Sequence, residues 1–204
     1  MRQLRSEFGA DWERLTEAEI YEYVVRTTRG FCPEAKGVRA RSLLYDSILL
    51  PLYHAAGLEY ESNYLLPFEP NLRPVWKEYD LLELPIYFND HFYLKNRGTS
   101  FDPTELKLDQ PGMKVVQFHP NMVFLNAPTD DHYQENRAHY HEPEKLRNNR
   151  YAGRGVRTLF LDLLDTIASK RLRTLTLGEV NALWRANGMT QHSEATPASG
   201  SMRA

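Results

Sequence analysis

Residues 111–127 read PGMKVVQFHPNMVFLNA, and this stretch decides the fold class. The run VVQF inside it is largely apolar and lacks strict alternation with polar residues, which is typical of a parallel strand buried on both faces. We therefore predict a strand at residues 113–119, bounded by Gly112 and Pro120. This strand places His119 at its carboxyl end, where parallel sheets collect their ligands.

Helical and strand patterns alternate on both sides of this segment. The predicted helices cover residues 17–29, 47–56, 156–171 and 176–185, and the predicted strands cover residues 36–44, 58–65, 82–88 and 113–119. Residues 67–78 are predicted to be irregular, and residues 127–155 to be a long surface loop that contains at most one helical turn. Helices inserted between strands favour parallel pairing through crossover connections, so the predicted fold class is α/β.

The composition is that of one globular domain: 204 residues, of which 42% are hydrophobic and 25% charged. We expect a leader at residues 1–15, an α/β domain at residues 16–188 and a disordered tail at residues 189–204. The net charge of -2 leaves no basic excess for binding nucleic acid. Acidic residues interrupt the apolar runs before they reach the length of a membrane span, and the lone Cys32 fits a reducing compartment. We therefore expect a cytoplasmic protein with no nucleic-acid or membrane partner.

His119 is the first candidate for catalysis. Pro120 restricts the backbone directly after it, and an imidazole held in this way could act as general acid or general base near neutral pH. A structural histidine bonded to a loop carbonyl remains the alternative.

Polar residues also recur on the first two predicted strands. Arg39 and Arg41 occupy alternate positions and would point to the same face, where one of them could orient a carboxylate from a neighbouring strand. Two solvated side chains on an edge strand are the alternative. On the second strand Glu61 and Asn63 share one face and Tyr64 lies on the other.

A histidine group, His132, His139 and His141 with Glu142, raises the question of a metal site. The spacing matches no helical zinc motif, and basic residues flank the group, so a solvated loop is the simpler interpretation. The sequence contains no GxGxxG, GxxxxGK[ST] or GxSxG motif, which leaves nucleotide-binding and esterase functions without support.

Four stretches together resemble the polysaccharide deacetylase superfamily, in the branch found among bacterial surface-polysaccharide genes. They are GVRARSLLYDS at residues 37–47, LEYESNYL at residues 58–65, ELPIYF at residues 83–88 and the segment at residues 111–127. Their order and spacing match from about residue 20 to residue 185, including the closing GRGVRTLFLDLL stretch.

The resemblance implies a distorted (β/α) barrel and zinc-dependent hydrolysis of an acetyl group on a sugar, with carbohydrate as the partner. Metal-bound water would attack the acetyl carbonyl, an aspartate would act as base and a late histidine would protonate the leaving group. On this pattern His119 takes the place of that histidine, and Arg39 that of the arginine that orients the catalytic aspartate. We expect the substrate to contact four further residues: Glu61, Asn63, Tyr64 and Trp76.

The chain also departs from the pattern. Relatives carry paired aspartates and a metal-binding histidine motif upstream of this region, whereas residues 1–35 contain neither, and Arg41 stands where relatives often have a histidine. We therefore expect a partial barrel that lacks its first strands, no zinc ligands in this chain and no cleavage by the chain alone. A partner chain or a second copy could supply the missing strands.

Two other functions remain open at this point. One is a carbohydrate-binding or scaffolding module without catalysis, in which aromatic side chains stack on sugars: Tyr60, Tyr64, Trp76 and Tyr87. The other is an enzyme whose metal site is rebuilt from His119 together with His132, His139 or His141.

Overall fold

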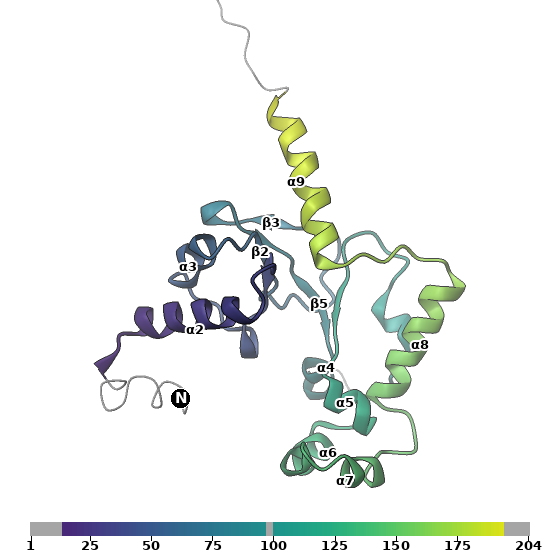
Figure 1. The fold of residues 1–204 in the computed structure, drawn as a ribbon. Coiled ribbons are helices and arrows are strands. Elements are labelled where there is room, and N and C mark those ends of the chain that lie inside the picture. The colour runs from purple at the N-terminus through teal and green to yellow at the C-terminus, as the bar shows by residue number, and fades with distance from the viewer. Residues whose placement is uncertain (1–13, 97–99, 194–204) are drawn as a thin grey trace, which may run out of the picture. The chain divides into compact units, whose positions relative to one another are not determined.

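A computed structural model describes residues 14–96 and 100–193 of the chain, with side chains up to residue 187 (Figure 1). The chain forms two compact units. Unit 1 comprises Met1–Ser62, Val75–Glu83 and Leu177–Ala204, and unit 2 comprises Asn63–Pro74 and Leu84–Thr176. Each unit is therefore built from separate stretches of the chain.

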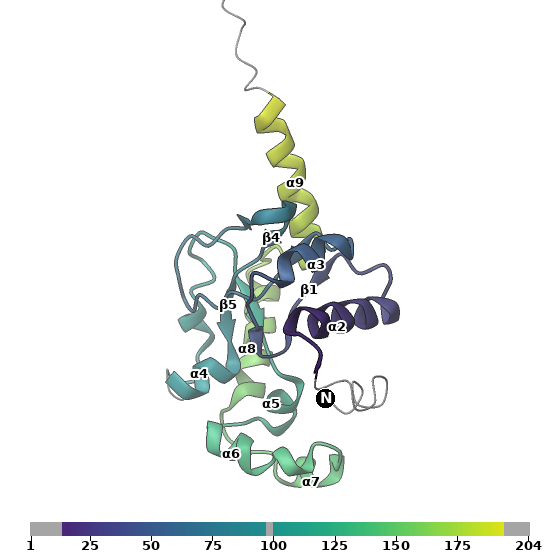
Figure 2. The ribbon, with the colours of Figure 1, turned by 90° about the vertical axis from the view of Figure 1, so that its left-hand side faces the viewer.

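Unit 1 contains a small sheet and three described α-helices. The helices are α2 (Glu17–Phe31), α3 (Leu49–Ala55) and α9 (Leu177–Ser193), with 3₁₀ turns at Arg41–Leu43 and Glu78–Asp80. The strands are β1 (Gly37–Val38), β2 (Tyr60–Glu61), β3 (Val75–Trp76) and β4 (Leu82–Glu83), in the order β1-β2-β4-β3. β1, β2 and β4 run parallel, and β3 pairs antiparallel with β4. Figure 2 shows α2 and α3 beside each other.

The start of α2 agrees with the prediction. The Thr16 hydroxyl accepts a hydrogen bond from the Glu19 backbone at 3.3 Å, and the Glu19 carboxylate accepts one from the Thr16 backbone at 2.8 Å. The helix continues past Gly30 to Phe31, because Arg29 donates to the carbonyl groups of Cys32 and Ala56 and holds the last turn.

A buried ion-pair cluster lies next to the apolar core of unit 1. Glu61 and Glu83 occupy paired positions on β2 and β4, and both are buried. The Lys77 side chain, 7% exposed, pairs with Glu61, and its Nζ lies 3.9 Å from Glu83. The core itself consists of Leu49, Leu50, Tyr53, Leu58 and Leu81.

Unit 2 packs helices around two parallel strands. The strands are β5 (Ile86–Asn89) and β6 (Val115–Gln117). The helices are α4 (Asp90–Asn96), α5 (Pro120–Leu125), α6 (Asp130–Glu135), α7 (Pro143–Asn148) and α8 (Val156–Ser169), with 3₁₀ turns at Pro103–Leu106 and Arg137–His139. Leu159 and Leu163 of α8 lie in the same core as Phe88 of β5 and Met122 of α5. The predicted helix at residues 156–171 is therefore confirmed.

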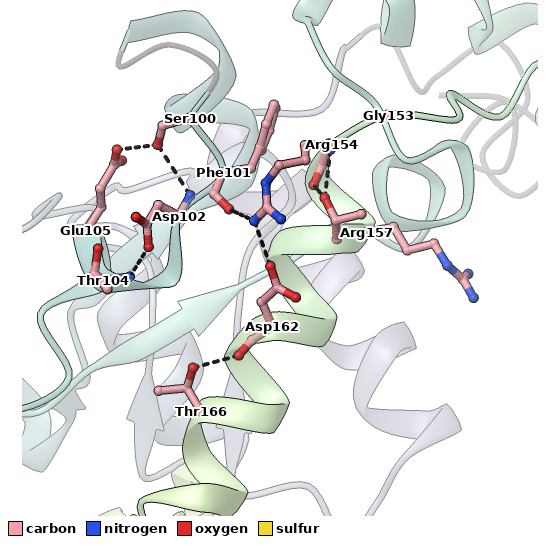
Figure 3. A network of polar contacts seen from close by, with 12 residues as sticks. Ser100, Phe101, Asp102, Thr104, Glu105, Gly153, Arg154, Arg157, Asp162 and Thr166 are labelled. Carbon is pink, nitrogen blue, oxygen red and sulfur yellow. Dashed lines mark hydrogen bonds and ion pairs between the residues drawn. The ribbon is translucent and has the colours of Figure 1, made fainter.

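An arginine at the start of α8 connects this helix to the segment that follows α4. Nη2 of Arg154 donates to the Phe101 carbonyl oxygen and to Oδ2 of Asp162, each at 2.6 Å (Figure 3). Ser100 and Asp102 in turn order the first turn at Pro103–Leu106 through hydrogen bonds to backbone N–H groups. This network holds residues 100–106, including the 3₁₀ turn, against α8.

The prediction of a long loop with at most one helical turn at residues 127–155 was wrong, because two α-helices, α6 and α7, and a 3₁₀ turn lie within it. Thr129 caps α6 by accepting a hydrogen bond from the His132 backbone, and Pro143 opens α7. Within α7 only Leu146 is buried. Helices this short and this polar carry no apolar periodicity, so their pattern resembled a loop.

The predicted strands were longer than the observed ones, and one of them is in fact two strands. The strand predicted at residues 82–88 is interrupted at Pro85, and its two parts, β4 and β5, belong to different sheets. Residues 67–78, predicted to be irregular, contain β3. The helix predicted at residues 176–185 continues past Gly188 to Ser193, so residues 189–193 of the expected tail are helical, and residues 194–204 lie outside the described part.

The α/β class and the parallel pairing are confirmed. Among the described residues, the strands of neither unit close into a barrel. The order of elements in unit 2 brings the carboxyl ends of β5 and β6 together, and this edge carries the residues described next.

Candidate functional site

Two polar residues follow neighbouring parallel strands of unit 2. Asp90 opens α4 directly after β5, and His119 is the N-cap residue of α5, two positions after the end of β6. Since β5 and β6 pair in parallel, both side chains lie at the same edge of the sheet. His119 therefore stands at the carboxyl end of a parallel strand, as the sequence predicted.

Asp90 and His119 form a closely bonded pair. Oδ1 of Asp90 lies 2.5 Å from Nδ1 of His119, and Oδ2 accepts the backbone N–H of His119 at 2.7 Å. The backbone N–H of His91 donates to Oδ1 at 2.8 Å. Asp90 is 0% exposed, so its carboxylate is held by these contacts away from water.

The pair determines the protonation of the imidazole. An ionised carboxylate only accepts hydrogen bonds, so Nδ1 of His119 is the protonated nitrogen. The Asp90 hydrogen bond raises the pKa of His119 above its ordinary value, burial opposes this shift, and the Asp90 charge adds to it. The His119 side chain is 37% exposed. Its Nε2 is therefore the atom that can exchange a proton with a bound molecule.

A second histidine–carboxylate pair lies beside the first. Nε2 of His91 is 2.9 Å from Oδ1 of Asp130 on α6. The rings of His91 and His119 meet edge to face, with centroids 6.0 Å apart and an interplanar angle of 80°. Asp130 also accepts a hydrogen bond from Gln134 and lies 3.8 Å from Nζ of Lys95.

The sequence prediction missed Asp90 and His91, although a signal for them was present. The rule that selected His119 takes polar residues after an apolar strand, and NDH at residues 89–91 follows a strand in the same way. Asn89 supports the edge: its Nδ2 donates to Gln117 on β6, and its Oδ1 accepts the backbone N–H of Phe92.

Arg39 belongs to unit 1, so the two predicted catalytic residues lie in different units. Its Nε donates to the Ser62 carbonyl oxygen at 3.0 Å and its Nη2 to the Ser62 hydroxyl at 2.7 Å. Burial lowers the pKa of Arg39, and the negative charge of Glu83 opposes this shift. Arg41 lies in a 3₁₀ turn, so the premise that it shares a strand face with Arg39 was wrong.

The predicted substrate-binding residues are divided between the units. Glu61 and Trp76 belong to unit 1, and Asn63 and Tyr64 to unit 2. Glu61 and Asn63 are buried, and Tyr64 is half-buried. Trp76 is 44% exposed, with the Arg185 guanidinium 4.9 Å from its ring centroid.

The other two proposed sugar-stacking residues are also divided. Tyr60 is half-buried in unit 1, whereas Tyr87 is buried in the core of unit 2. The proposed stacking residues therefore do not all form part of one unit.

In residues 14–96 and 100–187, the part of the chain whose side chains the structure describes, no group of three His, Cys, Asp or Glu side chains could hold a metal ion. The proposed metal site built on His119 was therefore wrong for this part of the chain. His139 pairs with Glu142, His141 is exposed, and Nδ1 of His119 faces Asp90. No helix in the same part is long and apolar enough to cross a membrane.

This chain matches one protein family and is similar to one solved structure. The WbmS-like polysaccharide deacetylase family matches residues 9–137. A search of the curated proteins found no match. Among solved structures, the chain is similar to a candidate polysaccharide deacetylase involved in O-antigen biosynthesis from Bordetella bronchiseptica, with 24% sequence identity and a TM-score of 0.64.

That similarity covers 71% of this chain and 61% of the Bordetella chain, and at this identity it concerns the fold. The present chain thus spans less than two thirds of that structure. The family match covers more than half of the 204 residues and includes both Asp90 and His119. The protein belongs to the WbmS-like polysaccharide deacetylases.

Proposed function

We propose that this protein acts in the hydrolysis of acetyl groups on a polysaccharide, and that His119 is its general acid. The observation that carries the proposal is the Asp90–His119 pair at the carboxyl ends of two parallel strands. A buried carboxylate holds one ring nitrogen, and the raised pKa keeps more of the imidazole protonated near neutral pH.

The chemistry of acetyl removal requires such an acid. A water molecule gives one proton to the group that activates it, and its oxygen adds to the acetyl carbonyl carbon. The bond from that carbon to the sugar nitrogen or oxygen then breaks. The leaving atom needs a proton, especially if it is nitrogen, because an amide anion is too basic to leave unprotonated. Nε2 of His119 would donate this proton while Asp90 stabilises the positive ring and keeps its orientation.

The described residues do not fit the zinc ion that the family resemblance implies. Zinc requires three or more His, Cys, Asp or Glu ligands at one point, and the described residues contain no such group. We propose that the chain supplies the acid and that a different partner chain completes a partial, distorted (β/α) barrel and activates the water. The chain by itself would then bind an acetylated sugar without cleaving it.

Two further parts of the proposal concern the surroundings of the reaction. Cys32 is a free, exposed thiol, which supports a reducing, cytoplasmic compartment. Arg39 remains proposed as the arginine that orients the catalytic aspartate; its support is that two hydrogen bonds to Ser62 hold the guanidinium and that the charge of Glu83 acts on it.

Two assays on the full chain test this function. In the first, the chain is incubated with zinc and an N-acetylated or O-acetylated oligosaccharide, and released acetate is measured; we expect none above the blank. In the second, calorimetry measures binding of the same oligosaccharides. We expect His119→Ala to weaken binding roughly 10-fold through loss of one charge-assisted hydrogen bond.

His141→Ala is the matched control, since His141 is exposed, and it should bind like the unaltered protein. Turnover that disappears in His119→Ala would establish the deacetylase and contradict the need for another chain. Equal binding by His119→Ala, or a flat trace for every oligosaccharide, would contradict the role of His119 in recognising an acetylated sugar.

A further inference from the structure

We propose that His91, anchored by Asp130, is a positioning residue that holds the His119 ring against Asp90. This inference rests on the proposed function. If His119 is the general acid, its ring must keep one orientation so that Nε2 points to the bound molecule. Four side chains from two helices and one strand end take part: Asp90, His91, His119 and Asp130.

The first observation is that His91 contacts the pair through both its backbone and its ring. Its backbone N–H donates to Oδ1 of Asp90, the same oxygen that lies 2.5 Å from Nδ1 of His119. Its ring meets the His119 ring edge to face, with centroids 6.0 Å apart. The His119 ring has one hydrogen bond to a side chain, that of Asp90. The contact with the His91 ring restricts rotation of the His119 ring about this hydrogen bond.

The second observation is that two residues of α6 contact the His91 ring. Oδ1 of Asp130 bonds to Nε2 of His91 at 2.9 Å, and the ring of Tyr133 lies 5.7 Å from the His91 ring, centroid to centroid. Asp130 and Tyr133 both belong to α6, which packs against α4. A short polar helix that the sequence analysis took for a loop therefore supports the site.

Several titratable or charged groups, on α4, on α6 and next to Tyr133, lie near the two histidines. Titratable or charged groups near the two histidines are Asp90 and Lys95 on α4, Asp130 and Tyr133 on α6, and Arg137 and Tyr140, which face Tyr133. A substitution that removes a charge would change the pKa of His119 by electrostatics alone. A test of positioning must therefore compare variants of equal charge.

His91→Ala and His91→Gln provide this comparison. Both remove the imidazole ring, but the glutamine Nε2 stands at the same number of bonds from the backbone as Nε2 of histidine and can still donate to Asp130. The readout is the Nδ1–H proton of His119 in protein labelled with ¹⁵N-histidine, identified by its absence in His119→Gln. The pKa of His119 is followed in the same samples.

We expect the Nδ1–H signal of His119 to be visible in the unaltered protein and in His91→Gln. In His91→Ala we expect it to exchange with water and disappear, and the pKa of His119 to fall relative to its pKa in His91→Gln. Asp130→Ala should also lose the signal, whereas Asp130→Asn, which has the same charge as Asp130→Ala and can still accept a hydrogen bond from His91, should keep it. This second pair keeps the test valid if His91→Ala does not fold. His141→Ala should retain it.

Retention of the signal in both His91→Ala and Asp130→Ala would overturn the proposal, as would its loss in His91→Gln, because the effect would then not depend on the anchor. The measurement uses no substrate. A flat binding trace for every oligosaccharide would refute the proposed function and leave this result intact, whereas a negative NMR result would refute the positioning role alone.

Discussion

His119 owes its charge state to one buried carboxylate. Asp90 is 0% exposed and accepts hydrogen bonds from the backbone and from Nδ1 of His119. Burial alone would favour the neutral imidazole, yet the pKa of His119 is raised, so the hydrogen bond and the charge of Asp90 outweigh desolvation. The local structure therefore favours a proton on this ring near neutral pH.

The pH dependence of stability follows from this shift. A histidine whose pKa is raised in the folded protein stabilises the fold fully below its unfolded pKa, about 6.5, and loses this contribution as pH rises through the folded pKa. Asp90→Asn removes the charge that causes the shift. We expect it to lower the free energy of unfolding by roughly 1–3 kcal/mol, with a greater loss at about pH 5.5 than at about pH 8.5.

Urea unfolding at the two pH values measures this effect. The control introduces Asp90→Asn into His119→Gln, where the pH-dependent part of the loss should vanish because no imidazole remains to pair with residue 90. A loss that is equal at both pH values in the otherwise unaltered chain would contradict the assignment of the shift to Asp90.

At the level of residues, the sequence identified His119 but not its partner. The predicted strand at residues 82–88 ends one residue before β5, whose last residue is Asn89, directly before Asp90. Asp90 and His119 are 29 positions apart. Their contact depends on β5 and β6 being neighbours, which the pattern of neither strand specifies.

Asn126 joins two helices of unit 2 through one buried side chain. It ends α5 with a left-handed backbone (φ 52°), and its Nδ2 donates to the carbonyl oxygens of Tyr151 and Gly153. Its Oδ1 accepts the backbone N–H groups of Arg157 and Thr158 in the first turn of α8. The first N–H groups of α8 have no partners within the helix, and Asn126 caps them although it lies about 30 positions earlier in the chain.

We predict that Asn126→Ala lowers the free energy of unfolding by about 3–4 kcal/mol. The change removes four hydrogen bonds of a buried amide and places an alanine in the left-handed region. Asn126→Gly tolerates the backbone and should recover about 1 kcal/mol of this loss. Denaturant unfolding checks both values.

Asn148→Ala serves as the control for this prediction. Asn148 is an exposed residue at the end of α7, and its replacement should change the stability by less than about 0.5 kcal/mol. If Asn126→Ala were no more destabilising than Asn148→Ala, the capping role of Asn126 would be refuted.

The helices and strands differ in how well the local sequence pattern predicts them. α2 begins with a capping box, and α8 carries apolar residues at helical spacing, so both were predicted close to their observed bounds. β1 and β2 contain two residues each, and α6 contains six. Elements of this length are stabilised by hydrogen bonds and packing from other segments, which a local pattern does not contain.

At the scale of the whole chain, unit 1 is assembled from segments that are far apart in sequence. Arg185 on α9 donates from Nη2 to the carbonyl oxygens of Glu59 and Asp80, and its guanidinium lies over the Trp76 ring. Asn181, one turn earlier, donates to the Glu59 carboxylate at 2.8 Å. The C-terminal helix therefore holds together segments more than 100 positions earlier in the chain.

We predict that Arg185→Ala loosens unit 1 and leaves unit 2 unchanged. Loss of about 2 kcal/mol would raise the hydrogen exchange of the Leu82 amide, which is bonded to the Glu59 carbonyl, by about 30-fold. The Ile86 amide in unit 2 is bonded to Tyr64 and should exchange at its original rate, because each unit has its own apolar core.

Arg173→Ala is the control, since Arg173 is exposed, and neither amide should respond to it. Equal acceleration of both amides in Arg185→Ala would show that the two units unfold as one. That outcome would contradict the separate response expected of two cores.

The sequence by itself determined the α/β class, the strongest helices and the position of His119 at a strand end, because each depends on neighbouring residues: periodicity, caps and the residue after an apolar run. The ordered motifs also indicated the deacetylase family. Tertiary structure alone decided that Pro85 separates two sheets, that Asp90 meets His119 and that Asp130 meets His91. These contacts join segments between 29 and 39 positions apart, and their formation depends on burial and strand pairing, which no local pattern records.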